Sequence, residues 1–450
     1  MRREGWTLAI AAAAVAAVAT LWLAPPEVAP SGDERDYLRA AIHRAHSGVH
    51  SSAPLDAGAP RRDAYREPAY PFLLAAWWRC TGTPPPAAEP DLAPAAWRAV
   101  PGVRGLGVLA LASAAAAAGA AARGAGAGRR AALAAGALVL ASPALRQAAL
   151  GLGPEAVAAA LASLAGCALV WSARGAGAGA VALAGLAAGL GVLVRGAGVA
   201  LIPAGAIVLL AAPRAGARRV RWARTALFTL LALAPGALWA ARNRAATGHW
   251  VISDRGGQVM WTRAELNREI AAEGLAPALL GWTPLDAARR LGERRWPAAR
   301  FSKYEWTGEG NFFTRSLRRW RAERRRTGDG LAADRELGRA ALHEFLKRPG
   351  DHAVAAVAVA WRGLFAERSP RRLAPVDLTF GLGLASAAGV GLALALGVRR
   401  RAAPILALLA VPVALFIFHA ALTEFLPRFA VPGLPLAWAA CVVAVGGRRG

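Results

Sequence analysis

The sequence predicts an all-α protein that crosses a membrane about ten times and carries one larger loop domain outside it. Of its 450 residues, 56% are hydrophobic, and they fall in long runs rather than in short alternating patterns. Arginine clusters separate the runs, and the net charge is +26. In a soluble protein this charge would suggest nucleic acid. Arginines that flank apolar runs are better explained by the excess of basic residues in cytoplasmic loops, so we expect no nucleic-acid partner.

The apolar runs give the expected spans in chain order. They lie at about 7–24, 100–122, 131–149, 155–173, 178–194, 197–213, 223–241, 376–398, 403–421 and 429–446. With this count the arginine clusters share one side, so the protein is expected in the inner (plasma) membrane with both termini cytoplasmic. Two alternatives stay open: a merged or missing span between Arg174 and Arg195, and cleavage of the first span as a signal peptide.

Two long segments without an apolar run, about 25–99 and 242–375, then face the outside. The expected domains are an N-terminal transmembrane catalytic module that includes the first segment, an external loop domain, and C-terminal transmembrane helices: 1–241, 242–375 and 376–450. Within the loop domain, apolar residues recur at helical spacing over 333–350, and Pro349-Gly350 ends that pattern.

Motifs for common soluble chemistry are missing from the sequence. Of the three cysteines, only Cys80 lies outside the expected spans, so it has no obvious disulfide partner. There is no Walker, HExxH, CxxC or strand-to-helix dinucleotide pattern, which gives no support to an ATPase, a zinc hydrolase or a Rossmann enzyme. His43, His46 and His50 are too loosely spaced to define a metal site. No cofactor is therefore certain, and a divalent metal stays possible.

An acidic group stands just after the first expected span. Asp33, Glu34 and Asp36 fall within four residues of one another, a short distance beyond Ala24. Carboxylates at the edge of the hydrocarbon are costly unless they are solvated, paired or used. The group is either a solvated juxtamembrane loop or part of a site that acts at the membrane surface.

Several short motifs occur in a fixed order along the chain. These are GDExxYLxxA from Gly32, RxPxYPxxLA from Arg66, Pro154-Glu155-Ala156, a glycine-rich helix that ends in Arg195, Arg242-Asn243, and EFLPRFAVPGLP from Glu424. Together they resemble the GT-C superfamily of integral membrane glycosyltransferases, which includes protein O-mannosyltransferases and lipid A aminoarabinose transferases. The glutamate of the last motif stands farther from its arginine than in the family, and Phe429 replaces a frequent tyrosine.

The resemblance implies external juxtamembrane helices and transfer of a hexosyl or pentosyl group from a polyprenyl-phosphate donor. The acceptor would be a lipid, glycan or protein on the external face, with membrane lipids around the site and inversion at the anomeric carbon. A phosphate leaves without being protonated. Such an enzyme therefore needs a carboxylate base for the acceptor hydroxyl and cations for the departing phosphate.

By this resemblance Asp33 is the catalytic base, because it matches the first acidic residue of the family motif. Glu34 orients the acceptor or Asp33, or else it is a helix N-terminal carboxylate that the helix dipole stabilises. Tyr37 is more consistent with packing than with catalysis. Arg66 and Tyr70 bound the substrate site, although Arg66 also fits a structural ion pair with an acidic neighbour such as Asp63.

The same resemblance assigns Glu155, Arg195, Glu424 and Arg428 to substrate binding. We expect the two arginines to hold the donor phosphate, since a guanidinium grips phosphate oxygens in bidentate fashion. Arg195 also fits a residue that reaches from an apolar helix to the interface, and Glu424 also fits a residue that neutralises Arg428.

Two other classes of function remain. One is a membrane protein that binds or translocates polyprenyl-linked lipids without chemistry, using the same arginines. Such a protein would not need the Asp33 carboxylate at the membrane edge. The other is a scaffold subunit that retains the fold and no activity.

Overall fold

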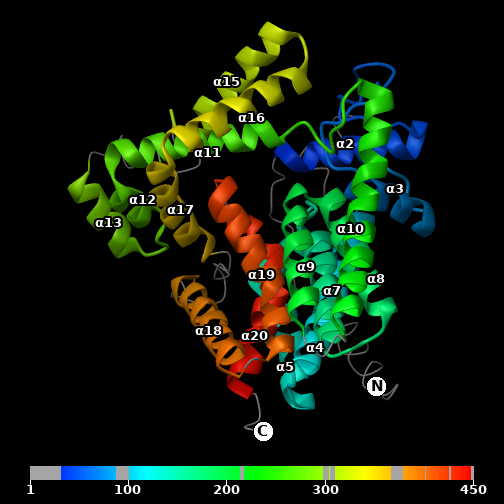
Figure 1. The fold of residues 1–450 in the computed structure, drawn as a ribbon. Coiled ribbons are helices and arrows are strands. Elements are labelled where there is room, and N and C mark those ends of the chain that lie inside the picture. The colour runs from blue at the N-terminus through cyan, green and yellow to red at the C-terminus, as the bar shows by residue number, and fades with distance from the viewer. Residues whose placement is uncertain are drawn as a thin grey trace. The chain divides into compact units, whose positions relative to one another are not determined.

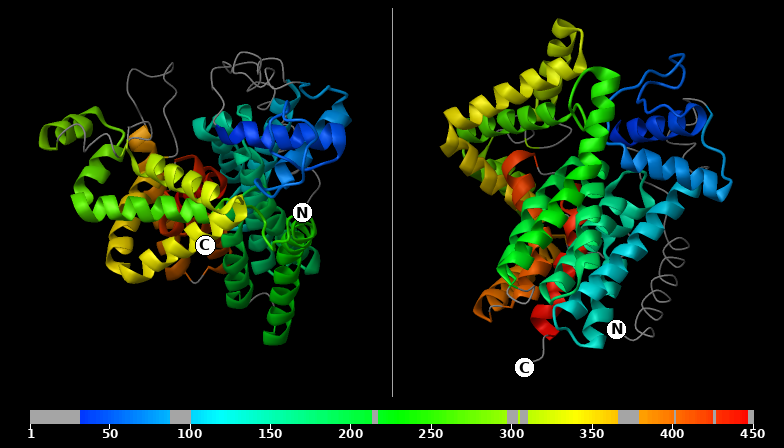
Figure 2. Two further views of the ribbon diagram at one scale, coloured as in Figure 1. Left: turned by 90° about the horizontal axis from the view of Figure 1, so that it is seen from above. Right: turned by 45° about the vertical axis from the view of Figure 1, so that its right-hand side comes forward.

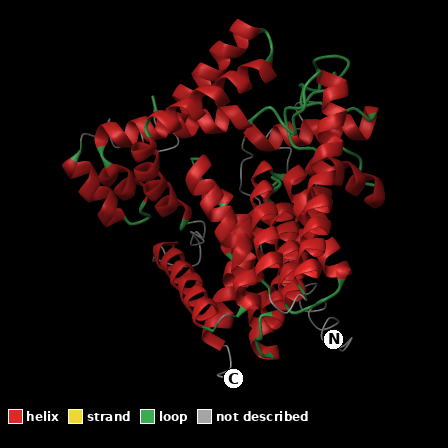
Figure 3. Ribbon diagram, in the orientation of Figure 1, coloured by secondary structure: helices red, strands yellow, loops and turns green. Residues whose placement is uncertain are grey.

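A computed structural model describes residues 32–87, 101–212, 217–296, 304, 310–365, 379–400, 402–424 and 427–446. Within these ranges every regular element is a helix, as Figure 3 shows. This confirms the all-α fold. The first expected span, 7–24, lies outside the described residues.

The described chain forms two compact units. Unit 1 contains the residues up to Ile252 together with Ser386–Leu415 and the residues from Val431 onward, and unit 2 contains Ser253–Ala385 and Phe416–Ala430. The domain boundaries expected from the sequence divide the chain by membrane side rather than by contact, so they stay predictions.

Unit 1 is a bundle of apolar helices with two polar helices at one end. Its helices are α2 (Gly32–Ser47), α3 (Ala69–Thr81), α4 (Pro101–Gly124), α5 (Arg129–Ala141), α6 (Pro143–Leu150), α7 (Glu155–Ala173), α8 (Ala178–Val194), η3 (Gly196–Ala200), α9 (Leu201–Ala211), α10 (Arg218–Thr247), η7 (Val431–Gly433) and α20 (Leu434–Gly446), with parts of α18 (Thr379–Arg399) and α19 (Ala403–Leu422). In Figures 1 and 2, α4, α7, α8 and α10 run side by side, and α2 and α3 (blue) lie at one end of them.

A helix or a pair of helices covers each of the nine expected spans that the structure describes. Five are long and apolar enough to cross a membrane: α4, α7, α10, α18 and α19. The helices α5 and α6 meet the same test together, and three shorter apolar stretches lie at α8, at η3 with α9, and at η7 with α20. The polytopic helical fold expected from the hydropathy pattern is therefore present.

The expected span at 131–149 is broken near its middle. The axes of α5 and α6 differ by 56°. Pro143, the first residue of α6, has no backbone N–H to continue the α5 hydrogen bonds. The Ser142 side chain instead accepts a hydrogen bond from the N–H of Leu145, 3.2 Å away, and so begins a new helix. The break follows from these two residues.

Glycine allows α8 to approach α10 closely. A Cβ added at Gly185 would lie 2.7 Å from the Phe228 carbonyl oxygen, and one at Gly189 would lie 2.6 Å from that of Ala232. Both distances are too short for a real side chain, so these positions accept only glycine without rearrangement. The GxxxG spacing in the sequence thus marks a backbone-to-backbone contact between two membrane helices.

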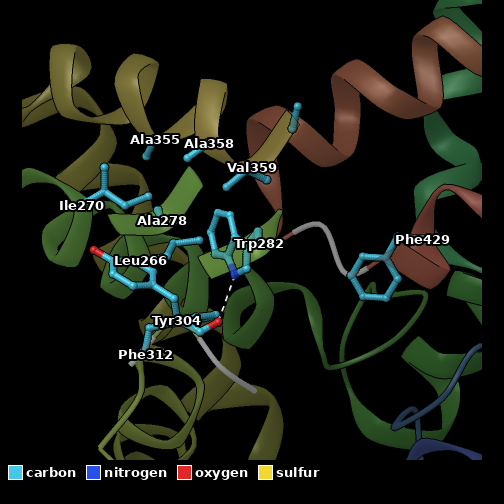
Figure 4. Close-up of a cluster of buried hydrophobic side chains, with 11 residues drawn as sticks. Leu266, Ile270, Ala278, Trp282, Tyr304, Phe312, Ala355, Ala358, Val359 and Phe429 are labelled. Carbon is cyan, nitrogen blue, oxygen red and sulfur yellow. Dashed lines mark hydrogen bonds between the residues drawn. The ribbon is translucent and has the colours of Figure 1, made fainter. Parts of the chain in front are cut away.

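Unit 2 is built from helices that pack around a small core. They are α11 (Gly256–Glu273), α12 (Leu275–Trp282), α13 (Asp286–Arg295), α15 (Phe312–Thr327), α16 (Gly330–Lys347), α17 (Pro349–Gly363) and η6 (Pro427–Phe429), with the remaining parts of α18 and α19. Figure 4 shows Trp282 edge-on to Tyr304, with ring centroids 5.9 Å apart, and the Trp282 Nε1–H donating to the Tyr304 carbonyl at 2.9 Å. The helix expected over 333–350 is α16, which ends at Lys347 just before Pro349.

Candidate functional site

The acidic group near the N-terminus lies on the first turn of α2. Asp33 and Glu34 are the acidic residues of that turn, where the exposed N–H groups and the helix dipole stabilise negative charge. Asp33 is about one-third exposed, and Asp36 faces inward with 16% of its side chain exposed. The helix thus presents one accessible carboxylate and one enclosed carboxylate on neighbouring turns.

Arg66 joins these two carboxylates. Its Nη2 lies 2.7 Å from Asp33 Oδ1 and 2.5 Å from Asp36 Oδ2, and its Nε donates to Asp36 Oδ2 at 3.1 Å. Burial would lower the pKa of Arg66, but Asp33, Tyr37 and Asp36 raise it well above its usual value. The pair with Asp63 that the sequence left open does not form, because the Asp63 carboxylate accepts hydrogen bonds from backbone N–H groups instead.

Tyr37 and Glu67 connect α2 to the backbone just after the C-terminal end of α8. The Tyr37 hydroxyl donates to Glu67 Oε2 at 2.7 Å, and the backbone N–H of Gly196 donates to Glu67 Oε1 at 3.4 Å. Burial, followed by the charge of Glu67, raises the pKa of Tyr37 well above its usual value. Tyr37 is therefore a neutral hydrogen-bond donor that fixes α2 on the bundle, in keeping with the packing role expected for it.

Glu155 and Arg195 form a second ion pair beside the first. Glu155 is the first residue of α7 and Arg195 follows the last residue of α8, and Arg195 Nη1 lies 2.6 Å from Glu155 Oε1. Both side chains are largely enclosed, with 11% and 16% exposed. Burial lowers the pKa of Arg195, but the charges of Glu155 and Tyr37 raise it more, so the net pKa is higher than usual.

The loop before α7 brings Glu34 to this pair. A Cβ added at Gly153 would lie 3.5 Å from Glu34 Oε1 and would collide with Glu155 Oε2, so both carboxylates border the same glycine. The Tyr70 hydroxyl donates to the Leu152 carbonyl at 2.9 Å and holds the loop to α3. Burial, then the charges of Glu155 and Glu34, raise the pKa of Tyr70.

The result is one cluster of charged residues at a single end of unit 1. We call it the acidic cluster, and it contains five carboxylates and three arginines: Asp33, Glu34, Asp36, Glu67, Glu155, Arg39, Arg66 and Arg195. It lies where α2, the segment before α3, the start of α7 and the end of α8 meet. A hollow of about 650 Å³ lined by Arg123, Trp171 and Arg174 lies at the opposite ends of α4 and α7 and is separate from it.

Glu424 and Arg428 belong to unit 2, whereas the other seven residues expected in the site belong to unit 1. The Glu424 side chain is 4% exposed, and its backbone carbonyl accepts a hydrogen bond from Arg362 Nη1 at 3.2 Å. Arg428 lies in η6 with its guanidinium 5.7 Å from the Phe429 ring centre. Arg263 fixes this region, because it donates to the Ala420 and Thr423 carbonyls at 2.5 and 2.9 Å.

Solved structures share this fold at low sequence identity. The archaeal oligosaccharyltransferase AglB from Archaeoglobus fulgidus, in complex with an inhibitory peptide and a dolichol-phosphate, matches 98% of the chain with a TM-score of 0.50 and 15% identity. The chain has the GT-C fold. A structure of the Archaeoglobus fulgidus oligosaccharyltransferase with Zn and sulfate matches 97% of the chain with a TM-score of 0.51 and 16% identity. The chain spans about half the length of these proteins, 50% and 49%.

Another structural match is ArnT from Cupriavidus metallidurans bound to undecaprenyl phosphate. It covers 99% of this chain and 78% of ArnT, with a TM-score of 0.40 and 17% identity. No protein-family profile and no curated protein sequence matches the chain.

Two carboxylates of the acidic cluster were not assigned a role from the sequence. Asp36 shares Arg66 with Asp33, and Glu67 joins Tyr37 to Gly196. Glu67 occupies a variable position of the motif that begins at Arg66, so the GT-C resemblance gave no reason to select it. Its position between two expected site residues, Arg66 and Tyr70, was the signal available.

A metal site is not built into the described part of the GT-C fold. Within it no three side chains of histidine, cysteine, aspartate or glutamate lie close enough together to hold an ion. His43 Nε2 lies 3.0 Å from the Ala53 carbonyl, and His50 Nε2 lies 3.2 Å from that of Arg66, so these histidines bond to the backbone. No step proposed below uses a divalent metal.

Proposed function

We propose that this protein is an integral membrane glycosyltransferase that moves a sugar from a polyprenyl-phosphate carrier to an acceptor on the external face of the membrane. The observation that carries the proposal is the acidic cluster, which gathers at the ends of apolar helices in a GT-C fold. The structure of AglB contains a dolichol-phosphate, and that of ArnT contains undecaprenyl phosphate. The first of these supports a lipid phosphate as the leaving group.

In the proposed reaction the acceptor hydroxyl attacks the anomeric carbon of the donor sugar. The acceptor loses its proton to the Asp33 carboxylate, and the bond between the anomeric carbon and the phosphate oxygen breaks with its electron pair on the phosphate. Attack opposite the leaving group inverts the anomeric configuration. Asp33 suits the role of base because it is the more accessible of the two carboxylates on Arg66.

The leaving phosphate requires cations, and Arg195 is the candidate in unit 1. It follows the last residue of α8, where its Nη1 donates to Glu155 Oε1 at 2.6 Å, and its planar guanidinium suits the oxygens of a phosphate. Arg428 in unit 2 is the second candidate. Each arginine would stabilise the negative charge that develops on the phosphate as the glycosidic bond breaks.

The neighbouring residues would position these groups. Arg66 holds Asp33 and Asp36 on the first turns of α2, and Tyr37 with Glu67 holds that helix to the end of α8. Glu34 borders the same glycine as Glu155, so it lies near the Arg195 pair. We therefore assign Glu34 to orientation of the acceptor rather than to proton transfer.

One observation favours the runner-up, a protein that binds or translocates polyprenyl-linked lipids without chemistry. The ion pair with Arg66 accounts for the Asp33 carboxylate without any reaction. A binder of this kind would use Arg195 and Arg428 for the phosphate and would retain its lipid affinity when Asp33 is replaced.

The test of the proposal is sugar transfer by the whole protein in membranes. Membranes that contain the protein are supplied with radiolabelled polyprenyl-phosphate hexose or pentose, and label is followed into lipid, glycan and protein fractions. Envelope glycans and glycoproteins of cells with and without the protein are compared by mass spectrometry to find the acceptor. Label transfer that depends on the protein and on Asp33 supports the enzyme. Donor binding with no transfer and no change in envelope glycans would support the lipid binder.

A further inference from the structure

A second group of charged residues lies in unit 1 outside the acidic cluster. Arg44 is on α2, Arg62 on the following loop, Arg79 in the last turn of α3 and Arg242 near the end of α10. We call these four residues the arginine patch. Arg62 and Arg79 are exposed, and Arg44 and Arg242 are partly exposed.

Two aromatic rings hold the arginine patch together. The Arg44 guanidinium lies 4.1 Å from the centre of the Phe72 ring, and the Arg242 guanidinium lies 4.6 Å from the Trp239 ring. The two rings meet edge to face at 5.9 Å. Two guanidinium groups are thus stacked on a joined aromatic pair, an arrangement that orders them without neutralising their charge.

His50 completes the aromatic support as a neutral side chain. It stacks on Phe72 and meets Trp239 edge to face, with ring centroids 6.4 and 5.1 Å away. The pKa of His50 is lowered to about 4, because burial and the charges of Arg242 and Arg44 outweigh the hydrogen bond to the Arg66 carbonyl, which raises it. His50 therefore adds no positive charge at neutral pH and serves as a spacer.

In the described part of the chain, no carboxylate accepts a hydrogen bond from the two stacked arginines of the patch, Arg44 and Arg242. Arg44 donates to the Gly48 carbonyl at 2.6 Å, and Arg242 donates to the Asp63 carbonyl and to Asn243 Oδ1 at 2.9 and 2.7 Å. All three acceptors are uncharged. The Asp63 carboxylate lies nearby but takes its hydrogen bonds from the backbone N–H groups of Ser52 and Tyr65.

The pKa values of the two stacked arginines agree with this excess of charge. Burial lowers the pKa of Arg44, and the neighbouring Arg79 lowers it further. Burial also lowers the pKa of Arg242, with Arg62 adding to the shift and Asp63 opposing it. An anion bound beside these guanidinium groups would relieve their mutual repulsion.

The apolar face of α10 leads directly to the patch. Leu230, Leu233 and Leu238 are 66, 52 and 74% exposed on a helix that is long and apolar enough to cross a membrane. Arg242 follows Leu238 by four residues and so lies one turn farther along the same face. A lipid whose tail lies against these leucines would therefore place its headgroup at the arginines.

We propose that the arginine patch binds the phosphate headgroup of an anionic phospholipid in the leaflet where α2 and α3 lie. Bound lipid would hold α3 and α2, which carries four of the eight residues of the acidic cluster, at the level of the headgroups. The proposal does not depend on transferase activity, and its test measures lipid binding alone.

The experiment compares the whole protein in nanodiscs made of phosphatidylcholine with and without phosphatidylglycerol, and measures retained phosphatidylglycerol by native mass spectrometry. Arg44→Gln with Arg242→Gln should weaken phosphatidylglycerol binding about tenfold or more, because the double variant removes the two stacked cations that would contact the headgroup phosphate. Arg321→Gln is the control, since Arg321 is an exposed arginine of α15 in unit 2 and lies outside the patch. It should leave the binding unchanged.

Arg62→Gln covers the case in which the double variant does not fold, because Arg62 is exposed and its replacement disturbs no packing. It should weaken phosphatidylglycerol binding by a smaller factor. Equal retention of phosphatidylglycerol by the wild type and by the folded variants would overturn the proposal. Displacement of phosphatidylglycerol by inorganic phosphate alone would show a site for free anions and would overturn the lipid assignment.

Discussion

In unit 1, Arg66 and Arg195 reach carboxylates that stand 30 to 40 residues away in the chain, at the ends of apolar helices. In unit 2, Arg268 and Arg315 instead reach glutamates along the sides of helices. Arg315 bonds to Glu265 and Glu269 of α11 at 3.1 and 2.6 Å, and Arg268 bonds to Glu344 of α16 at 3.0 Å.

The two arrangements have different consequences for folding. The helices of unit 1 pack through small residues, as at Gly185 and Gly189, and the ion pairs of this unit lie at the helix ends, outside those contacts. In unit 2 the ion pairs cross the contacts between α11 and its neighbours α15 and α16. Charges that the helix packing does not require are candidates for function. We therefore expect substitutions in the acidic cluster to affect chemistry and those in unit 2 to affect stability.

The largest expected effect is a difference in thiol labelling that reports on which side of the membrane each loop lies. In sealed cells an impermeant thiol reagent should label a cysteine placed at Gly310 and should not label one placed at Gly216, because the second lies in an arginine-rich loop expected in the cytoplasm. The native Cys80 is exposed and must first be replaced by serine. The reverse labelling pattern would put unit 2 inside and would remove the external active site.

Replacement of the base should give the largest loss of turnover. Asp33→Asn keeps the shape of the side chain and its contact with Arg66 but cannot accept the acceptor proton, so transfer should fall by about 10²-fold or more. Donor binding should survive, and the melting temperature should change little because Asp33 is partly exposed. Turnover is measured with a labelled polyprenyl-phosphate sugar at equal amounts of folded protein.

Two matched variants sharpen this result. Glu34→Gln should be milder, since a charge at a helix terminus contributes about 0.3 to 1 kcal/mol. Asp36→Asn removes the other partner of Arg66 and tests the ion pair without touching the proposed base. Normal turnover by Asp33→Asn with a strong loss in Asp36→Asn would move the base to Asp36.

The next effect concerns the donor phosphate. Arg195→Gln and Arg428→Ala should each weaken donor binding by about 1.5 to 3 kcal/mol, the contribution of a hydrogen bond to a charged group. Arg195→Gln also leaves Glu155 enclosed without its cation, so the double variant with Glu155→Gln is needed to restore folding. Donor affinity that recovers in this double variant would show that Arg195 serves only to neutralise Glu155.

The smallest expected effect concerns the ion pairs of unit 2, which we expect to contribute to stability and not to transfer. Arg315→Gln removes two ion pairs in unit 2 and should lower the free energy of unfolding by about 1 kcal/mol, because the arginine is about one-third exposed. Arg289→Gln is the control, since its pair with Glu293 is exposed on both sides. Transfer by Arg315→Gln should equal that of the wild type when folded protein is matched, and a selective loss of transfer would place unit 2 among the catalytic elements.

Local features of the sequence were sufficient for the helices. Asp33 and Glu34 mark the first turn of α2, and Pro349 follows the end of α16, because helix starts and stops depend on residues within one turn. The break at Pro143 was missed, although the same local rule produces it. The apolar runs were read as continuous, and a proline within a run changes its direction without changing its hydropathy.

The sequence by itself therefore determined the all-α membrane fold, the order of the spans and which residues carry charge at their ends. Only the tertiary structure decided that Arg66 pairs with Asp33 and Asp36 rather than Asp63, and that Glu67 reaches Gly196 across 129 positions. Hydropathy and capping are properties of neighbouring residues. The partner of a charged side chain depends instead on which helix ends meet, and that is set by the packing of the whole bundle.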